Sequence, residues 1–396
     1  MLTPAYVFDH GALSSRCEVW RSRCLAPGVS QLFPLKCNSL TSTLRTISDY
    51  VDGFAVSSLF EARLAREYAL RDQKIHFTSP GLRSDEIDAV LSYCDGVTFN
   101  SLSQWKRHKQ DAVGTATCGL RLNPQISFVR DSRYDPSRER SKLGVPLEQI
   151  ERALESDPKL FDGIEGVHFH TNCDSTDWSP LLLTVSKLAQ RIPNFLRQCR
   201  WINFGGGYLL EDDTDLSKYW DAISLAREFN LEVVLEPGAS ISREAGVLVS
   251  TVVDIFESDG AQIAILDSSV NHLPEVFEYQ YAPDVQGDAV DGEYSYTLAG
   301  SSCLSGDVFG EYGFHSPLEV GSKITFVGVG AYSVVKSHMF NGINLPAVYF
   351  KTKDGRLELQ NISDYNDFRK RCGAEPHEIV RNLDASIRGS RRRRSA

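Results

Sequence analysis

Three stretches of this 396-residue sequence place reactive groups directly after short apolar segments. Lys36 follows Phe33–Leu35, and a lysine amine at such a position can form a Schiff base with a carbonyl cofactor. Gly205–Gly207 would expose backbone N–H groups to an anion such as phosphate. Glu236 would favour the protonated form of a pyridine ring beside it, because opposite charges stabilise each other.

Two further side chains could take part in this chemistry. His170 ends another apolar run, where a neutral imidazole could stack on an aromatic cofactor; strand alternation would place His168 on the same face. Cys303 lies among small residues, and a reachable thiol can donate a proton. The cluster of His168, His170, Cys173 and Asp174 matches no standard zinc spacing, so we predict no metal site.

Each of these features also has an ordinary structural explanation when it is considered alone. The lysine could be solvated, the glycines could form a tight turn, and the glutamate could cap a helix. The histidine could be structural, and the cysteine could be buried and inert. Only their order along the chain and the elements that carry them can distinguish these alternatives from a functional site.

The elements around these residues alternate between short apolar runs and helical stretches. This alternation predicts parallel βαβ units, and eight of them favour a (β/α)8 barrel, with a doubly wound open sheet as the main competitor. Catalytic groups of such barrels lie at the C-terminal ends of the strands. We predict a barrel domain over residues 11–246. The expected strands include Phe33–Leu35, Phe54–Val56, Ile75–Phe77, Val97–Phe99, Cys118–Leu122, Val167–Phe169, Trp201–Phe204 and Val233–Leu235.

After about residue 246 the pattern changes to strands with few helices between them. We therefore predict an all-β domain over residues 1–10 and 247–396, in which Tyr6–Phe8 supplies one strand. Its C-terminal segment, 388–394, is basic, and we expect it to be a solvated tail. The other expected strands are Val247–Ile255, Gln262–Leu266, Tyr294–Leu298, Lys323–Val329, Ala347–Phe350 and Leu357–Gln360.

Composition limits the possible functions further. The formal charge is −10, although the last eleven residues contain five arginines and no acid, so the body of the protein is acidic. Broad nucleic-acid binding is therefore not expected. No apolar run approaches the roughly 20 residues that span a bilayer, and no signal peptide is visible. Nine scattered cysteines without a Cys-x-x-Cys pair indicate reduced thiols, hence a cytoplasmic protein without membrane attachment.

Taken in order, the sequence resembles the fold-type III pyridoxal-phosphate decarboxylases, whose barrel is of the alanine racemase type. The resemblance extends from Thr3 to about Phe350. It is carried by Leu35–Asn38, His170, Gly205–Gly207, Glu236–Gly238, the Cys303 loop, Gly330–Tyr332 and Phe340–Gly342. Within the family, the carboxynorspermidine (carboxyspermidine) decarboxylases are most similar. Three stretches indicate this: Ala55–Leu59, Asp267–Glu275 and, most specifically, Cys303–Tyr312.

The resemblance implies pyridoxal 5′-phosphate as the cofactor and assigns roles at matching positions. Lys36 would hold the cofactor covalently, and His170 would stack on its ring. Glu236 would pair with the pyridine nitrogen, and Arg121 would lie near the cofactor. The implied reaction is decarboxylation of an amino acid, with the cofactor as electron sink.

The phosphate contacts are also implied by the resemblance. Gly205, Gly206 and Gly207 would hold the phosphate group, and Tyr332 would reach it from the β domain. These assignments combine residues that are far apart in the sequence, so they depend on the fold that the family shares.

The remaining implied roles concern the substrate and a second subunit. Cys303 would come from the partner subunit of a homodimer with shared active sites and would protonate the carbanion left by carbon dioxide. Glu275 and Asp307 would meet a distal cation of the substrate, which would be a small-molecule amino acid such as carboxynorspermidine or carboxyspermidine.

Two positions depart from patterns found among the resembling enzymes. Ala239 stands where the carboxynorspermidine enzymes have an acid that contacts substrate, and Leu304 stands where the diamine decarboxylases have an aspartate. These departures leave open a pyridoxal-phosphate decarboxylase of a different amino-acid intermediate. A catalytically silent regulatory homologue is the other alternative, which retention of Lys36, Glu236 and Cys303 disfavours.

Overall fold

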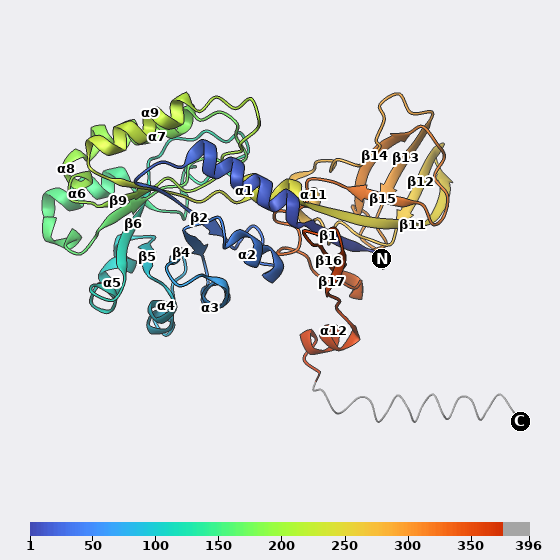
Figure 1. The fold of residues 1–396 in the computed structure, drawn as a ribbon, viewed down its shortest axis with the longest axis horizontal. Coiled ribbons are helices and arrows are strands. Elements are labelled where there is room, and N and C mark those ends of the chain that lie inside the picture. Colours follow the sequence, from blue (N-terminus) through green and yellow to red (C-terminus); the bar gives the residue numbers. More distant parts are fainter. Residues whose placement is uncertain (375–396) are drawn as a thin grey trace, which may run out of the picture. The chain divides into compact units, whose positions relative to one another are not determined.

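The computed structural model describes residues 1–374, which form two compact units (Figure 1). The barrel unit comprises Asp9–Ala245 together with Gly330–Val335. The β unit comprises Met1–Phe8, Gly246–Val329 and residues 336–374. The predicted basic segment 388–394 lies outside the described residues.

The barrel unit contains the eight parallel strands that the apolar runs predict, and they close on themselves. The order around the barrel is β5-β4-β3-β2-β10-β9-β8-β6, and β6 pairs again with β5. This closure confirms the barrel and excludes the open-sheet alternative. The strands are β2 (Val29–Pro34), β3 (Gly53–Val56), β4 (Lys74–Ser79), β5 (Gly96–Phe99), β6 (Thr117–Asn123), β8 (Gly166–His168), β9 (Trp201–Asn203) and β10 (Glu232–Leu235).

Helices follow the strands, and some begin at recognisable capping residues. Ser58 caps α3 by accepting from the Glu61 N–H, and Ser101 caps α5 by accepting from the Gln104 N–H. Within residues 1–374, no helix has the length and apolar character required to cross a membrane. The helices of the unit are α1 (His10–Cys24), α2 (Thr41–Ile47), α3 (Leu59–Tyr68), α4 (Ile87–Tyr93), α5 (Leu102–Ala112), α6 (Leu147–Ser156), α7 (Ser179–Arg191), α8 (Pro193–Leu196), α9 (Ser217–Glu228) and α10 (Ala239–Ser242).

The interior of the barrel is filled partly by one large aromatic ring. A Cβ atom on Gly166 would lie 2.1 Å from the Trp201 ring, and one on Gly119 would lie 2.3 Å from it. His76 packs edge-on against this ring at 5.0 Å between centroids, and its Nε2 lies 3.0 Å from Thr98 Oγ1. Glycine is therefore required on β6 and β8 because Trp201 takes the space that branched side chains fill in other barrels.

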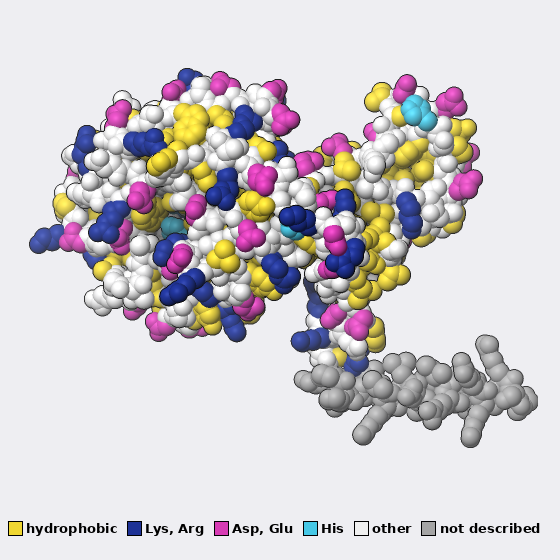
Figure 2. Space-filling model, in the orientation of Figure 1, with side chains coloured by type: hydrophobic (Ala, Val, Ile, Leu, Met, Phe, Trp, Pro, Cys, Tyr) yellow, Lys and Arg dark blue, Asp and Glu magenta, His cyan; other side chains and the backbone are white. Residues whose placement is uncertain are grey.

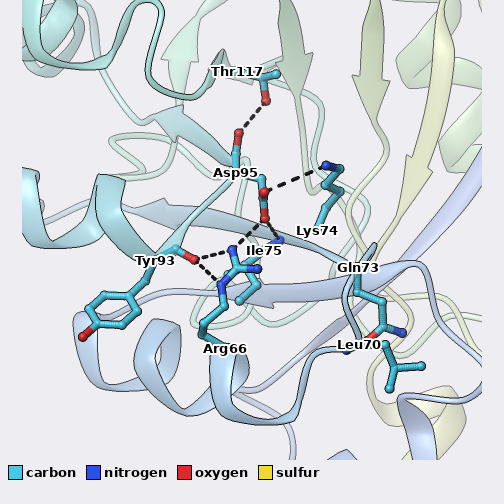
Figure 3. A network of polar contacts seen from close by, with 8 residues as sticks. All are labelled: Arg66, Leu70, Gln73, Lys74, Ile75, Tyr93, Asp95 and Thr117. Atoms are coloured by element: carbon cyan, nitrogen blue, oxygen red, sulfur yellow. Dashed lines mark hydrogen bonds and ion pairs between the residues drawn. The ribbon is translucent and has the colours of Figure 1, made fainter.

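A polar network joins the N-terminal ends of three strands around Asp95 (Figure 3). The Asp95 carboxylate accepts from the Ile75 N–H at 2.9 Å and from Arg66 Nη2 at 2.8 Å. Its backbone carbonyl accepts from the Thr117 N–H at 2.9 Å. A hollow of about 1270 Å³ lies at this end, opposite the predicted site, and Asp95 and Trp201 line it. Since catalytic groups of barrels lie at the other end, we assign this network to stability.

We expect Asp95→Ala to lower the thermal unfolding midpoint at pH 7 by roughly 2–4 °C. This corresponds to about 1 kcal/mol in a domain of this size, a reduced value because the ion pair is partly exposed to solvent. Lys74→Ala is the control. Its ammonium lies 3.9 Å from Asp95 Oδ1 and is 70% exposed, so we expect almost no change.

The stabilisation by Asp95 should depend on pH. Burial raises the pKa of Asp95, but the Ile75 N–H and Arg66 more than offset this and hold it below its usual value. A lowered carboxyl pKa stabilises the folded state above the unfolded pKa of about 3.9, and this contribution is lost as pH falls through the lower value. The midpoint difference between wild type and Asp95→Ala should shrink from pH 7 to pH 3. A constant difference would contradict the role of the charge.

The β unit contains the N-terminal strand and the predicted C-terminal strands, together with one strand that was not predicted. As expected, Tyr6–Phe8 lies in a strand, β1 (Ala5–Asp9), which pairs antiparallel with β11. The sheet order is β14-β13-β12-β11-β1-β16-β17, and β15 also pairs with β11. The strands are β11 (Gly246–Ser258), β12 (Ala261–Leu266), β13 (Tyr294–Ala299), the unpredicted β14 (Val308–Phe314), β15 (Lys323–Phe326), β16 (Ala347–Lys351) and β17 (Leu357–Asn361); the helices are α11 (Pro274–Tyr279) and α12 (Tyr365–Arg371).

Candidate active site

Four predicted site residues meet in a small pocket at the C-terminal ends of the barrel strands. Lys36 follows β2, Arg121 lies near the end of β6, His170 follows β8, and Glu236 follows β10. The pocket has a volume of about 40 Å³. Its lining consists of Pro34, Lys36, Ala55, Val56, Ser57, Thr78, Arg121, His168, His170 and Glu236.

Lys36 stands on a tight turn that a second segment supports. Cys37 N–H donates to Pro34 O at 3.2 Å, which closes the turn and leaves the Lys36 side chain exposed. Tyr332 N–H donates to Cys37 O at 2.8 Å, and Asn38 Nδ2 donates to Gly330 O at 2.9 Å. These bonds hold Gly330–Val335 in the barrel unit.

Our expectation for Tyr332 therefore needs a correction. We expected it to belong to the β domain, but its segment groups with the barrel because its backbone bonds to the turn that carries Lys36. Tyr332 has φ of 56°, a left-handed conformation that is uncommon outside glycine. Such strain clusters at ligand sites, which is consistent with a role beside the cofactor.

The glycine loop requires glycine at every position. A Cβ atom would lie 2.6 Å from Phe169 O at Gly205, 2.2 Å from Glu236 O at Gly206, and 2.1 Å from Asn172 O at Gly207. Gly205 and Gly207 also have φ of 68° and 90°. The loop is thus a close-packed backbone turn, in which the N–H groups of Gly205 and Gly206 donate to Asn203 Oδ1 and His170 Nδ1.

His170 is neutral and fixed by the same loop. Its Nδ1 accepts from the Gly206 N–H at 3.1 Å, which assigns the ring proton to Nε2. Burial, Lys36 and Arg121 all hold the pKa of His170 well below its usual value. A neutral ring in a fixed orientation can stack on an aromatic cofactor without adding positive charge to the pocket.

Glu236 is coupled to the glycine loop through a residue that the sequence reasoning missed. Asn203 Nδ2 donates to Glu236 Oε1 at 2.8 Å, while Asn203 Oδ1 accepts from the Gly205 N–H at 2.8 Å. Glu236 N–H also donates to Gly205 O at 2.7 Å. The side chain of Asn203 thus connects the Glu236 carboxylate to the glycine loop. An asparagine within an otherwise apolar strand, Trp201–Phe204, was the available signal.

Arg121 and His168 complete the polar interior of the pocket. Arg121 is 9% exposed, and burial lowers its pKa to about 10 although Glu236 opposes the shift. His168, which lies in register with Arg121 on the neighbouring strand, is 2% exposed. Neither ring nitrogen of His168 has a hydrogen-bond partner among residues 1–374.

These residues fit pyridoxal phosphate in two respects. Lys36 is an exposed amine that lines the pocket, and the buried carboxylate of Glu236 in the same pocket can face a ring nitrogen. The pocket therefore has a group for the carbonyl carbon and a group for the ring nitrogen of this cofactor.

The other predicted residues lie in the β unit, and one of them has a structural role. Asp307 is 3% exposed, and its carboxylate accepts from Ser269 Oγ at 2.8 Å, Val270 N–H at 2.8 Å and Ser302 N–H at 2.9 Å. These bonds organise the loop that carries Cys303. We therefore correct the expectation that Asp307 meets a substrate cation, because its oxygens are already used.

The two other predicted residues of the β unit are Cys303 and Glu275. Cys303 is exposed, and its N–H donates to Asn341 Oδ1 at 2.9 Å. Glu275 is half-buried on α11, where its Oε1 accepts from Lys336 Nζ at 3.3 Å. Lys336 also pairs with Glu278, so the three side chains together carry one net negative charge.

Comparison with protein families agrees with this geometry. Residues 10–243 match the family model described as "Pyridoxal-dependent decarboxylase, pyridoxal binding domain". The chain is 33% identical over 380 residues to carboxyaminopropylagmatine decarboxylase of a Synechocystis strain, covering 94% of this chain and 95% of that protein. It is also 33% identical to carboxynorspermidine/carboxyspermidine decarboxylase of Campylobacter jejuni, covering 93% of this chain and 98% of that protein.

Solved structures agree as well. The structure of carboxynorspermidine decarboxylase from Campylobacter jejuni, complexed with norspermidine, superposes with a TM-score of 0.83 at 30% identity and covers 94% of this chain and 100% of that one. Diaminopimelate decarboxylase from Helicobacter pylori, complexed with L-lysine, gives a TM-score of 0.81 at 20% identity, which supports the fold alone; it covers 94% of this chain and 98% of that one.

Proposed function

Because this chain belongs to the family of pyridoxal-dependent decarboxylases, we propose that it removes the α-carboxylate of a carboxylated polyamine. The observation that carries this proposal is the convergence of Lys36, the glycine loop and Glu236 at one end of the barrel. Carboxynorspermidine and carboxyspermidine are our first candidate substrates.

The residues of the barrel unit have distinct roles in this reaction. Bound pyridoxal phosphate supplies an electron sink for the charge that remains when carbon dioxide leaves. Lys36 would hold the cofactor through its amine. Glu236, whose carboxylate accepts from Asn203, would face the ring nitrogen, where an opposite charge favours the protonated ring, and His170 would lie against the ring.

A distal cation on the substrate would be attracted by the acidic cluster of Glu275, Glu278 and Lys336. Lys336 forms ion pairs with both Glu275 and Glu278, so the cluster has one net negative charge. Ala239 supplies no acid, so Glu275 is the remaining predicted contact for a long cationic substrate.

Carboxyaminopropylagmatine is a second candidate substrate. The relative from Synechocystis that carries this activity in its name is as similar as the carboxynorspermidine relative, at 33% identity over nearly the whole chain. The test is release of carbon dioxide from carboxynorspermidine, carboxyspermidine, carboxyaminopropylagmatine and meso-diaminopimelate by the purified protein. Preference for diaminopimelate over all three polyamine derivatives would overturn the proposal.

We expect Glu275→Gln to raise KM about tenfold for the preferred polyamine derivative and to leave KM for diaminopimelate unchanged. A hydrogen bond to a charged group contributes about 1.5–3 kcal/mol, and 1.4 kcal/mol corresponds to a factor of ten. Glu278→Gln is the matched control, because Glu278 is the more exposed partner of the same lysine. Equal effects on both substrates would show that Glu275 is structural.

A homodimer with shared active sites forms part of the proposal. Gly306 of the Cys303 loop lies against the ring of Phe277, which is 48% exposed, and Phe340 beside Asn341 is 46% exposed. Figure 2 shows further hydrophobic side chains at the surface of the β unit. Clustered exposed aromatic residues mark interaction surfaces. Cys303 would thus enter a partner's site and return a proton to the product.

Subunit mixing tests this arrangement. Lys36→Ala and Cys303→Ala should each be nearly inactive, but mixed and exchanged subunits should recover about one quarter of wild-type activity. Half of the random dimers are heterodimers, and each has one of two sites intact in a two-fold assembly. Activity that stays at the parental level after proven exchange would exclude a contribution of Cys303 across the interface.

A further inference from the structure

The imidazole of His168 is a buried polar group whose hydrogen bonds are not satisfied by the protein. It is 2% exposed, and both of its ring nitrogens are without a partner among the described residues. Buried polar groups in native proteins almost always have partners, so an unsatisfied one requires an explanation. His168 also lines the pocket that contains Lys36 and Glu236.

The position of His168 in the barrel limits which ligand could satisfy it. It lies in register with Arg121 on one side and with Asn203 on the other. Asn203 is already bonded to Glu236 and Gly205. His168 therefore shares the unassigned part of the pocket with Arg121, whose guanidinium contains only donors.

Burial and the positive groups nearby determine the protonation state of the His168 imidazole. Burial, followed by Arg121, His170, His76 and Lys36, holds the pKa of His168 well below its usual value. A neutral imidazole has one N–H donor and one acceptor nitrogen. A ligand atom that meets both this donor and Arg121 must be an acceptor, and an anionic oxygen suits both groups best.

Pyridoxal phosphate has one such group that the site does not otherwise hold. Its phosphate is assigned to the glycine loop, its carbonyl carbon to Lys36 and its ring nitrogen to Glu236, which leaves the ring hydroxyl oxygen. We propose that His168 contacts the cofactor by donating a hydrogen bond to this oxygen, beside Arg121. This inference rests on the proposed function of the site, because it assumes that the cofactor binds there.

A cycle of protein and cofactor changes tests the contact. The full-length protein, freed of cofactor, is titrated with pyridoxal 5′-phosphate or with 3-deoxypyridoxal 5′-phosphate, which lacks the ring oxygen, and binding is followed by cofactor absorbance. We expect the Kd of the wild type for the deoxy compound to be at least ten times its Kd for pyridoxal 5′-phosphate. In His168→Phe this ratio of the two Kd values should fall at least threefold, because the ring oxygen has lost a donor that the wild type provides.

Three further variants make the result specific. His168→Gln keeps an N–H donor and should retain most of the wild-type ratio. His168→Leu should give the same result as His168→Phe, and it takes the place of the phenylalanine variant if that variant does not fold. His108→Phe is the matched control, because His108 is also 2% exposed and has an unpartnered Nε2, but it lies on α5 outside the pocket. It should show the wild-type ratio.

The outcomes separate this inference from the proposed function. If all variants show the wild-type ratio while the wild type binds pyridoxal phosphate on Lys36, a water molecule satisfies His168 and the proposed contact is wrong. If the wild type does not attach the cofactor to Lys36, the proposed site itself fails.

Discussion

Replacing Lys36 by alanine should lower the rate of carbon dioxide release at least about a thousandfold. The cofactor then has no covalent attachment and no amine to exchange with the substrate, which raises the barrier by about 4 kcal/mol. Borohydride reduction of the wild type should leave a stable adduct on the peptide that contains Lys36, detected by mass spectrometry. Lys74→Ala, which alters a lysine at the opposite end of the barrel, should keep both activity and adduct.

The position of the adduct decides the result. Lys36 is the one lysine that lines the small pocket, which it shares with His170 and Glu236. An adduct on a different lysine, or a fully active Lys36→Ala protein, would show that the chemistry takes place elsewhere.

Glu236→Gln should reduce kcat about a hundredfold while the protein keeps most of its cofactor. Glutamine retains an oxygen that can accept from Asn203, so the pocket should keep its shape. However, a neutral amide cannot keep the ring nitrogen protonated, and a hundredfold loss corresponds to about 2.7 kcal/mol of barrier. Steady-state kinetics and cofactor content measured on the same preparation test this expectation.

Glu232→Gln is the matched control for Glu236→Gln. Glu232 begins β10, while Glu236 directly follows the end of this strand, so the two acids lie at opposite ends of the barrel. Its substitution should leave kcat unchanged. An unchanged kcat in Glu236→Gln, with full cofactor content, would remove Glu236 from the proposed mechanism.

Much of the barrel could be predicted because its strands are short and buried on both faces, and most of their side chains are apolar. All eight apolar runs overlap strands, although several bounds differ, since parallel strands inside a layer of helices have no solvent-facing side. In the β unit the same reasoning missed β14. This strand contains Gly310, Gly313 and the exposed Glu311, so its intrinsic preference is weak and its pairing with β13 stabilises it instead.

The site was predictable where single residues carry the chemistry and not where backbone contacts do. Lys36, His170 and Glu236 stand at strand ends, which the apolar runs reveal. The placement of Tyr332 in the barrel unit depends on its N–H bond to Cys37, and no residue type encodes such a bond. Asp307 looked like a free acid because the sequence does not show the three donors that surround it.

The pairing of β2 with β10 has a consequence for how this protein folds. These are the first and last strands of the barrel, joined in register at Val29 and Val233, and they carry Lys36 and Glu236 just beyond their ends. Contacts so far apart in the sequence form late, whereas the Asp95 network links neighbouring segments that can assemble early. The cofactor pocket therefore does not exist until β2 and β10 pair. Cofactor bound between these two strands stabilises the closed barrel, by about 2.7 kcal/mol when the cofactor concentration is a hundred times its Kd. The supply of cofactor in the cell should thus govern how long the newly made chain survives, as well as how fast it works.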